Sequence, residues 1–141
     1  MDALPILTFQ VGDQTYGLRI GDVLEVAAMV ELLPMPQALP EMLGLVNRHG
    51  EIIPLLDMRV IMGLQRQAVN VDTFFIVVEH GSLHVGLVVD KIDQVKYFLD
   101  EQFQPIPGNP LVRWIVNDSG AIIQVLEVDT IIGRVMPQME R

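Results

Sequence analysis

The sequence predicts an all-β protein made of two small barrels packed together, and three observations carry this prediction. Short runs rich in β-branched and aromatic residues, such as LTFQV, FFIVV and AIIQVLEV, are bounded by Gly, Asp or Asn, as strands are. Long stretches with helical periodicity are mostly missing. An internal repeat also runs through the chain, which indicates that one unit of short strands is present twice.

The repeat consists of two blocks at nearly the same offset, 69 residues in the first and 70 in the second. Its matching pairs include Gly12 with Gly81, Gly17 with Gly86, Asn47 with Asn117 and Gly50 with Gly120. Chance similarity is the alternative, since glycines at hairpin corners recur in any β protein. Two blocks at almost one offset favour a true duplication.

Each copy offers about five short strands, and closing them into a barrel removes the exposed edges that an open sheet would have. We therefore expect one domain over 1–141, with a first barrel at 13–68 and a second at 71–128. The segments 6–12 and 129–136 are expected to cross between the barrels, and a joint core is expected where the barrels meet.

Local signals place turns and helices. Gly12-Asp13 and Gly81-Ser82 each separate two strand-like runs and predict hairpin turns. One short helix is expected near Pro40–Leu43, because Pro is tolerated in a first turn, and another from Asp129 towards Val135. The stretches 31–40, 65–72 and 104–110 are expected to be loops.

Composition excludes several classes of function. The chain carries 9 basic and 18 acidic side chains, for a net charge of −9, which argues against a nucleic-acid partner. There is no Cys, so disulfides and thiolate metal sites are excluded. The first ten residues have no basic segment typical of a secretory signal, and no apolar run is long enough to span a bilayer. These features predict a cytoplasmic protein without direct membrane insertion.

A search for catalytic chemistry finds little. Ser82 and Ser119 each lie beside a Gly at a turn and outside any nucleophile elbow, and no phosphate-binding loop occurs. His80 and His84 flank a predicted turn and are expected to face each other across it, but two ligands without a third make a weak metal site. We therefore expect no catalytic residue, no metal and no cofactor.

Two other features leave alternatives open. Asp57 and Arg59 are two apart, which places both on one face of a strand, as a structural ion pair or as part of a docking face. Met29, Met35 and Met42 fall near the Pro-rich loop, where methionines either fill the space between barrels or form an adaptable partner surface.

Four strings are distinctive when taken together: YGLRIGDVLEV at 16–26, MLGLVNRHGEIIPLLDMR at 42–59, HVGLVVDKIDQV at 84–95 and AIIQVLEVDTII at 121–132. With them the chain resembles the CheW-like coupling proteins of bacterial chemosensory systems. The resemblance covers about residues 7–133.

This resemblance implies two intertwined, five-stranded SH3-like barrels with one or two short helices. It implies a non-enzymatic adaptor that bridges the cytoplasmic tips of methyl-accepting chemoreceptors and the regulatory domain of a CheA-type histidine kinase. Such adaptors lie in receptor arrays at the inner face of the membrane.

The functional positions follow from the matched strings. Those implied to bind the receptor are Val23, Gly44, Arg48, His49, Phe74 and Val95, with Gly44 and His49 at a receptor-facing corner and Phe74 and Val95 in the groove between barrels. Those implied to dock the kinase or the receptor are Glu25, Asp57 and Arg59.

One departure stands out, because the family's Asn-Leu-Arg-Gly is Asn-Arg-His-Gly here. Neighbouring strand residues point to opposite sides, so Arg48 is not expected to replace the charge that His49 lacks. Standard receptor pairing is therefore in doubt. Three other functions stay open: an adaptor in a pathway that controls pili or gene expression, a small-ligand-binding double barrel, and a hydrolase or metal enzyme that uses His80 and His84.

Overall fold

The computed structural model describes residues 3–136. Its long strands are β1 (Ala3–Val11), β2 (Gln14–Arg19), β3 (Val23–Ala28), β4 (Met42–Arg48), β5 (Glu51–Asp57), β6 (Phe74–His80), β7 (Leu83–Val89), β8 (Lys91–Leu99), β10 (Val112–Asp118) and β11 (Ala121–Leu126). The two-residue strand β9 (Gln104–Pro105), the helices α1 (Met58–Ile61) and α2 (Val128–Val135) and the 3-10 turns η1 (Ile20–Asp22) and η2 (Asp100–Gln102) complete the described elements.

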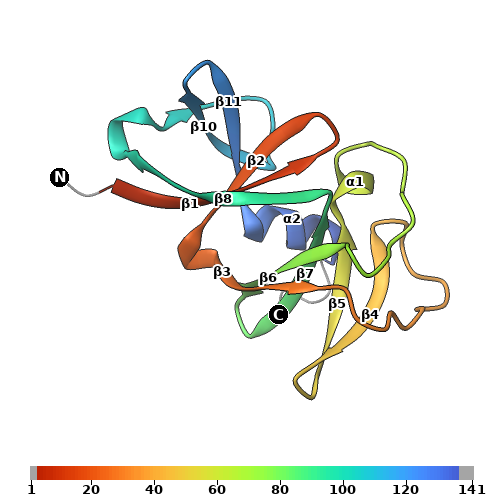
Figure 1. Ribbon diagram of the computed structural model, residues 1–141. Helices are drawn as coiled ribbons and strands as arrows, with labels where there is room; N and C mark the ends of the chain where they lie inside the picture. The colour runs from red at the N-terminus through yellow and green to blue at the C-terminus, as the bar shows by residue number, and fades with distance from the viewer. Residues whose placement is uncertain (1–2, 137–141) are drawn as a thin grey trace.

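The strands form two sheets with α2 between them (Figure 1). Sheet A has the order β8-β1-β2-β11-β10-β9, and sheet B has the order β3-β6-β7-β5-β4. The predicted fold class is confirmed: residues 3–136 are all-β, in two units with two short helices. Sheet A gains its sixth strand from the short β9, which pairs with β10 at two positions.

Each sheet combines strands from both repeats. The β1–β2 hairpin of the first repeat pairs in parallel with β11 of the second, and the β6–β7 hairpin of the second pairs in parallel with β5 of the first. The two pairings are equivalent under the repeat, since Val125 opposite Gly17 corresponds to Leu55 opposite Gly86. This division of strands differs from the predicted barrels at 13–68 and 71–128, because the two repeats exchange their first hairpins.

Gly17 and Gly86 are needed where the exchanged hairpins approach the neighbouring strands. A Cβ at Gly17 would lie 2.5 Å from Cγ2 of Ile6 in its own hairpin and 3.2 Å from Cγ2 of Ile123 on the partner strand β11. A Cβ at Gly86 would lie 3.0 Å from Cδ2 of Phe75 in its own hairpin and 2.3 Å from Cδ2 of Leu55 on the partner strand β5. A larger residue at either position would therefore crowd both its own hairpin and the partner strand from the other repeat. The recurrence of this glycine pair in the sequence therefore records a packing constraint rather than a turn.

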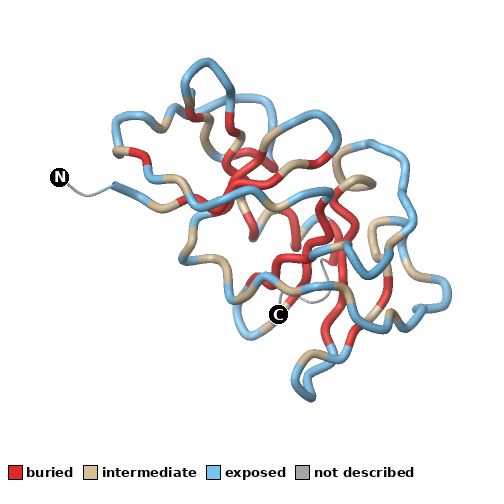
Figure 2. The backbone as a smooth tube through the Cα atoms, in the orientation of Figure 1, coloured by how far each residue is buried: buried red, intermediate tan, exposed pale blue. Residues whose placement is uncertain are grey.

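Packing between the sheets forms the predicted joint core, which Figure 2 shows as buried chain in the middle of the molecule. Sheet A contributes Phe9 and Leu18, sheet B contributes Ile76 and Leu87, and α2 contributes residues such as Ile131, all of them fully buried. Burial of this kind provides most of the favourable free energy of folding.

Each sheet also has a smaller core of its own. The members of the sheet B core at Val46, Ile53, Leu55 and Phe75 correspond under the repeat to Val116, Ile123, Val125 and Ile6 of the sheet A core. The duplication therefore extends to the packing inside each sheet.

The predicted turns at Gly12 and Gly81 are confirmed, with positive φ angles of 63° and 60°. The helix expected from Asp129 is confirmed as α2, while the helix expected near Pro40–Leu43 is wrong, because the chain turns there and enters β4 at Met42. The helix that does form, α1, begins directly after β5. There Asp57 accepts a hydrogen bond from the backbone N–H of Arg59 and caps the helix.

We expect Gly86→Ala to lower the free energy of unfolding by about 1–3 kcal/mol, because the new methyl group overpacks the contact with Leu55 and Phe75. Gly21→Ala is the matched control, since a Cβ at Gly21 meets nothing within 4 Å, and its effect should stay within about 0.5 kcal/mol. Urea unfolding followed by circular dichroism measures both. Equal effects of the two changes would contradict the close-approach role of Gly86.

Candidate functional site

The turn between β4 and β5 has the geometry of a two-residue hairpin loop. His49 and Gly50 both have positive φ angles, 54° and 85°, and the backbone N–H of Gly50 donates a 2.9 Å hydrogen bond to Oδ1 of Asn47. Arg48 and Glu51 pair across the hairpin on either side of this loop. Asn, Asp and His are the non-glycine residues best tolerated at positive φ, so His49 suits its position.

The same turn occurs at the equivalent place between β10 and β11. Ser119 and Gly120 have φ angles of 55° and 95°, and the N–H of Gly120 donates a 2.9 Å hydrogen bond to Oδ1 of Asn117. Asn47 and Asn117, which the repeat pairs in the sequence, therefore hold equivalent turns. The backbone is shared by the two copies, while the side chains at the loop positions differ.

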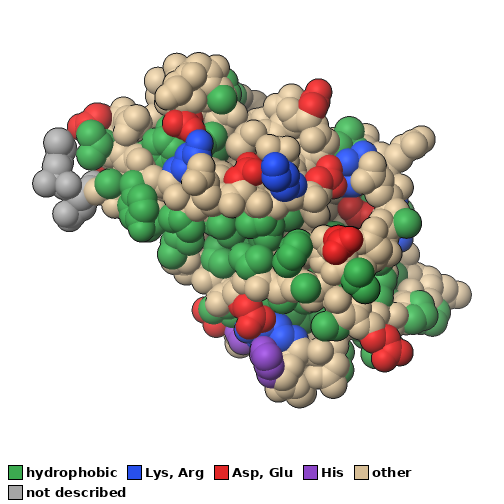
Figure 3. All heavy atoms as spheres, in the orientation of Figure 1, with side chains coloured by type: hydrophobic (Ala, Val, Ile, Leu, Met, Phe, Trp, Pro, Cys, Tyr) green, Lys and Arg blue, Asp and Glu red, His purple; other side chains and the backbone are tan. Residues whose placement is uncertain are grey.

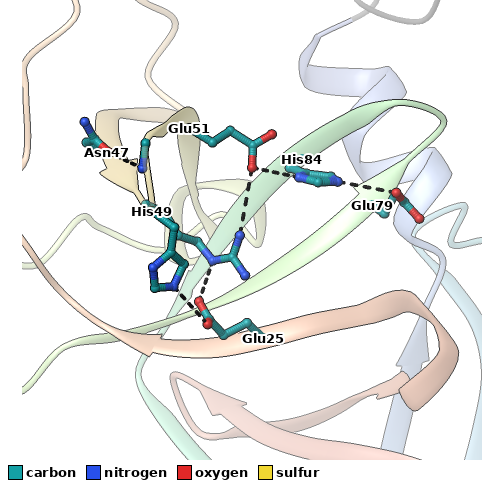
Figure 4. Close-up of polar contacts among 8 residues, drawn as sticks. Glu25, Asn47, His49, Glu51, Glu79 and His84 are labelled. Atoms are coloured by element: carbon teal, nitrogen blue, oxygen red, sulfur yellow. Dashed lines mark hydrogen bonds and ion pairs between the residues drawn. The ribbon is translucent and has the colours of Figure 1, made fainter.

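Arg48 and His49 both reach Glu25 on β3. Nε of Arg48 donates a hydrogen bond to Oε1 of Glu25, and Nε2 of His49 lies 3.5 Å from its Oε2. The expectation that these neighbours point to opposite sides is wrong, because His49 has left the extended conformation and its side chain turns back towards β3. Figure 4 shows the imidazole of His49 directed at the carboxylate of Glu25.

A chain of charged groups continues from this point to β7. Nη1 of Arg48 lies 3.9 Å from Oε1 of Glu51, and the same oxygen lies 2.9 Å from Nδ1 of His84. Nε2 of His84 in turn lies 3.3 Å from Oε2 of Glu79 (Figure 4). The β4–β5 turn is therefore tied to β3 through Glu25 and to the β6–β7 hairpin through His84.

These contacts shift two pKa values. The hydrogen bond from Arg48 lowers the pKa of the Glu25 carboxyl; partial desolvation opposes this effect, and the charges of Arg48 and His49 add to it. The hydrogen bond to Glu51 raises the pKa of His84, partial desolvation opposes it, and Glu79 adds to the increase. Both shifts favour the charged forms of the two groups.

His80 and His84 do not face each other, contrary to the prediction. In the β6–β7 hairpin, His84 lies opposite Glu79 and His80 lies opposite Leu83, so the two rings occupy opposite faces. Nδ1 of His80 lies 2.7 Å from Oδ1 of Asp129 at the start of α2. Within residues 3–136, no group of three or more His, Asp or Glu side chains is placed to hold a metal ion.

Asp57 and Arg59 are not partners through their side chains, and the expectation that they share one face of a strand is wrong because β5 ends at Asp57. The Asp57 carboxylate is buried, and Nε of Arg66 donates a 3.1 Å hydrogen bond to its Oδ2. Nη1 of Arg59 donates a 2.6 Å hydrogen bond to Asp90, which also accepts one from the N–H of Gly12. These contacts hold α1 against both sheets, and a docking role for either residue stays a prediction.

Gly44 does not lie at an exposed corner. It is buried within β4, where a Cβ would lie 2.6 Å from the carbonyl oxygen of Leu33. The loop at 31–40 covers it through the bridge between Leu33 and Leu45. Of the two residues assigned to the receptor-facing corner, only His49 is exposed, and its side chain is 75% accessible.

Hydrophobic side chains gather in a band between the two sheets on one face of the molecule (Figure 3). The strands bordering this band expose Leu24 and Val26 of β3, Phe74 of β6, and Val95 and Tyr97 of β8. Phe74 is 42% exposed and Val95 is 39% exposed, so both predicted groove residues are accessible to a partner.

Val23 differs from the other predicted groove residues, since it is half-buried and packs against the central core. The sequence interpretation selected Val23 and Glu25 but missed their neighbours Leu24 and Val26, which point outwards. Burial alternates along β3, with a bulge between Val23 and Glu25, and positions 24, 26 and 28 are exposed. The sequence does not show which of the two faces of β3 is exposed, because both faces carry apolar residues.

The methionines near the Pro-rich loop divide between the two roles that the sequence left open. Met29 and Met42 are partly buried and pack against the cores. Met35 is 44% exposed. Two of the three methionines therefore fill space in the cores, and Met35 remains available to a partner.

The fold and this surface together define a duplicated all-β module whose prominent surface features are an apolar band and a charged turn. The model of the CheW-like domain family matches residues 5–136, and the chain belongs to this family. The resemblance seen in the sequence is thereby confirmed.

Two curated relatives and one solved structure illustrate the similarity. The chain is 29% identical to the chemotaxis protein CheW of Rhizobium meliloti, over 96% of this chain and 89% of the relative. It is 25% identical to the chemotaxis protein CheW of Helicobacter pylori, over 94% and 84%. The crystal structure of the scaffolding protein TtCheW from Thermoanaerobacter tengcongensis superposes with a TM-score of 0.85 at 26% identity, covering 94% of this chain and 93% of that one.

The helices were also compared with the requirements of a membrane span. In the part of the chain that the structure describes, none has the length and apolar character needed to cross a bilayer.

We expect His84 to make stability depend on pH near neutrality. Because its pKa is raised in the folded state, its stabilising effect is complete below the ordinary His value of about 6.5 and is lost as pH rises through the folded value. His84→Gln should remove this pH-dependent loss. The free energy of unfolding of the variant should then fall less between pH 6 and pH 9 than that of the unmodified protein.

Urea unfolding at several pH values measures the difference, and NMR titration of the His84 ring gives its pKa directly. A folded-state pKa at or below about 6.5 would contradict the charged bridge between Glu51 and Glu79.

Proposed function

We propose that the chain is a non-enzymatic scaffold that couples methyl-accepting chemoreceptors to a CheA-type histidine kinase, within receptor arrays at the cytoplasmic face of the membrane. The observation that carries the proposal is the exposed apolar band between the two sheets. It is supported by a family match over nearly the whole chain and by relatives named as chemotaxis and scaffolding proteins.

The band has the character of a docking surface. The cores of both sheets are already formed by other residues, so Leu24, Val26, Phe74, Val95 and Tyr97 are not required to complete them. An apolar patch that remains exposed on a folded protein marks an interaction site. A band bordered by two edge strands, β3 and β8, fits the apolar face of an amphipathic helix, which is the form in which a receptor tip would present itself.

The charged turn lies beside one of these strands. Glu25 belongs to β3, and its contacts with Arg48 and His49 place two basic side chains at this edge strand, on the face opposite Val26. A partner helix bound along β3 would therefore meet an apolar surface with a mixed charged border. Such a border contributes to the choice of partner more than to affinity.

A reconstituted assay tests the proposal. Receptor, kinase and this protein from one organism are combined, and kinase activity is measured with and without the receptor ligand. Kinase activity that responds to the receptor only when this protein is present supports the scaffold function. No association with a receptor-tip fragment or with the kinase regulatory domain at about 100 µM, the weak end of the affinity scale, would overturn it.

We expect Val26→Glu and Val95→Glu each to weaken binding of the receptor-tip fragment by about tenfold or more. A buried aliphatic side chain contributes about 1.5–3 kcal/mol, and 1.4 kcal/mol corresponds to a factor of ten. Both residues are exposed in the free protein, so the free energy of unfolding should change little. Ile122→Glu, at a somewhat more exposed apolar position in β11, is the control and should bind normally.

We expect His49→Arg to strengthen coupling to a receptor that pairs with family members carrying Arg at this position, since a guanidinium provides a permanent charge and several donors. Ser119→Arg, at the equivalent position of the other turn, carries the same backbone strain and the same added charge and should have no such effect. Kinase activation in the reconstituted assay gives the comparison. If both changes strengthen coupling equally, His49 does not determine partner preference.

A further inference from the structure

A second feature with the properties of a binding site lies at the end of sheet A where β1 begins. It is a pocket of about 640 Å³ between the start of β1, the turns η1 and η2, and β10. This volume lies in the range of small-molecule sites. None of its lining residues is among the predicted docking residues, so a ligand in this pocket would be independent of the proposed scaffold function.

The interior of the pocket is apolar. Ile6 is fully buried in the sheet A core, and Phe103 and Trp114 are partly buried and pack against that core. Leu4 and Ile20 also line the pocket. Two aromatic rings and several aliphatic side chains therefore offer contact to an apolar group of a ligand.

Four charged residues line the same pocket, and their charges balance: Arg19 and Arg113 are basic, Asp22 and Asp100 are acidic. Nε of Arg19 lies 3.4 Å from Oδ2 of Asp22, but the geometry is not that of a hydrogen bond. Within residues 3–136, Oδ2 of Asp22 is the buried side-chain polar atom without a hydrogen-bond partner.

The guanidinium groups also have donors to spare. Arg113 uses Nη1 for a 2.5 Å hydrogen bond to Glu127, and its guanidinium carbon lies 5.8 Å from the centre of the Trp114 ring. Among the described residues, Asp22 is the one partner of the Arg19 side chain. Each guanidinium has five N–H donors, so both retain donors for a carboxylate.

A ligand with a single charge would be attracted by one pair of these residues and repelled by the other pair. A ligand with adjacent positive and negative groups gains from both. We propose that this pocket binds a small zwitterion with an apolar side chain, the chemical class of the aliphatic and aromatic amino acids. Its carboxylate pairs with Arg19 and Arg113, its ammonium group with Asp22 and Asp100, and its side chain packs on Trp114 and Phe103.

Trp114 is the only tryptophan of the chain, so intrinsic fluorescence reports on this pocket directly. The probe is L-leucine, and we expect a saturable change in emission with a dissociation constant of about 1 mM or below. Three analogues isolate the contributions: 4-methylpentanoate lacks the ammonium group, 3-methylbutylamine lacks the carboxylate, and glycine lacks the side chain. Each should bind at least about tenfold more weakly.

Variants test the assigned residues. Arg19→Gln, Asp22→Asn and Asp100→Asn should each weaken L-leucine binding by about fivefold or more, whereas Lys91→Gln, an exposed charge on β8 outside the pocket, should not. Asp100→Asn leaves the Arg19–Asp22 ion pair intact, so weaker binding by this variant reports the lost contact with the ligand rather than a change in folding. Circular dichroism verifies the fold of each variant.

The proposal is overturned if L-leucine gives no saturable change up to about 50 mM, far above the range of specific sites, or if 4-methylpentanoate binds equally well. Neither result bears on the scaffold function, which the receptor and kinase assay decides separately.

Discussion

The parallel pairing of β5 with β7, and of β11 with β2, is the constraint on which both sheets depend. Each pairing brings a hairpin of one repeat against a strand of the other, and each needs a glycine, Gly86 or Gly17, to let the strands approach. Because both hairpins are exchanged, the sheets face each other across a shared core closed by α2. The apolar band lies between β3 and β8, one end strand from each sheet.

Different forces hold the two parts of the candidate docking surface. The strands beneath the band are fixed by buried aliphatic packing, which does not depend on protonation. The β4–β5 turn beside it is fixed by contacts of Glu25 and His84 with charged groups, and these change strength with pH. A partner would therefore meet a rigid apolar surface whose neighbouring charged turn responds to its environment.

Much of the fold could be predicted from the sequence because its signals are local. Alternating β-branched residues mark the strands, and Gly12 and Gly81 mark two turns. The sequence predicted a crossing of segment 6–12 but not the exchange of two whole hairpins, since a repeat shows which residues are equivalent and not which strands pair. The site was predicted less well for the same reason: His49 leaves the strand geometry at positive φ, Asp57 ends its strand and caps a helix, and Gly44 lies beneath a loop. In each case a local conformation or a distant segment decides the outcome.

The exchanged hairpins also describe an assembly of two molecules. If the chain were cut between α1 and β6, every pairing between the repeats would become a contact between two polypeptides, each lending its first hairpin to the other. A protein consisting of one repeat would therefore reach the same architecture as a domain-swapped dimer. The connector at 62–73 joins the two repeats covalently, so that the pairing of a dimer is found within one chain. Once the two copies are joined, their turns are free to diverge, and here one carries Arg48 and His49 while the other carries Asp118 and Ser119.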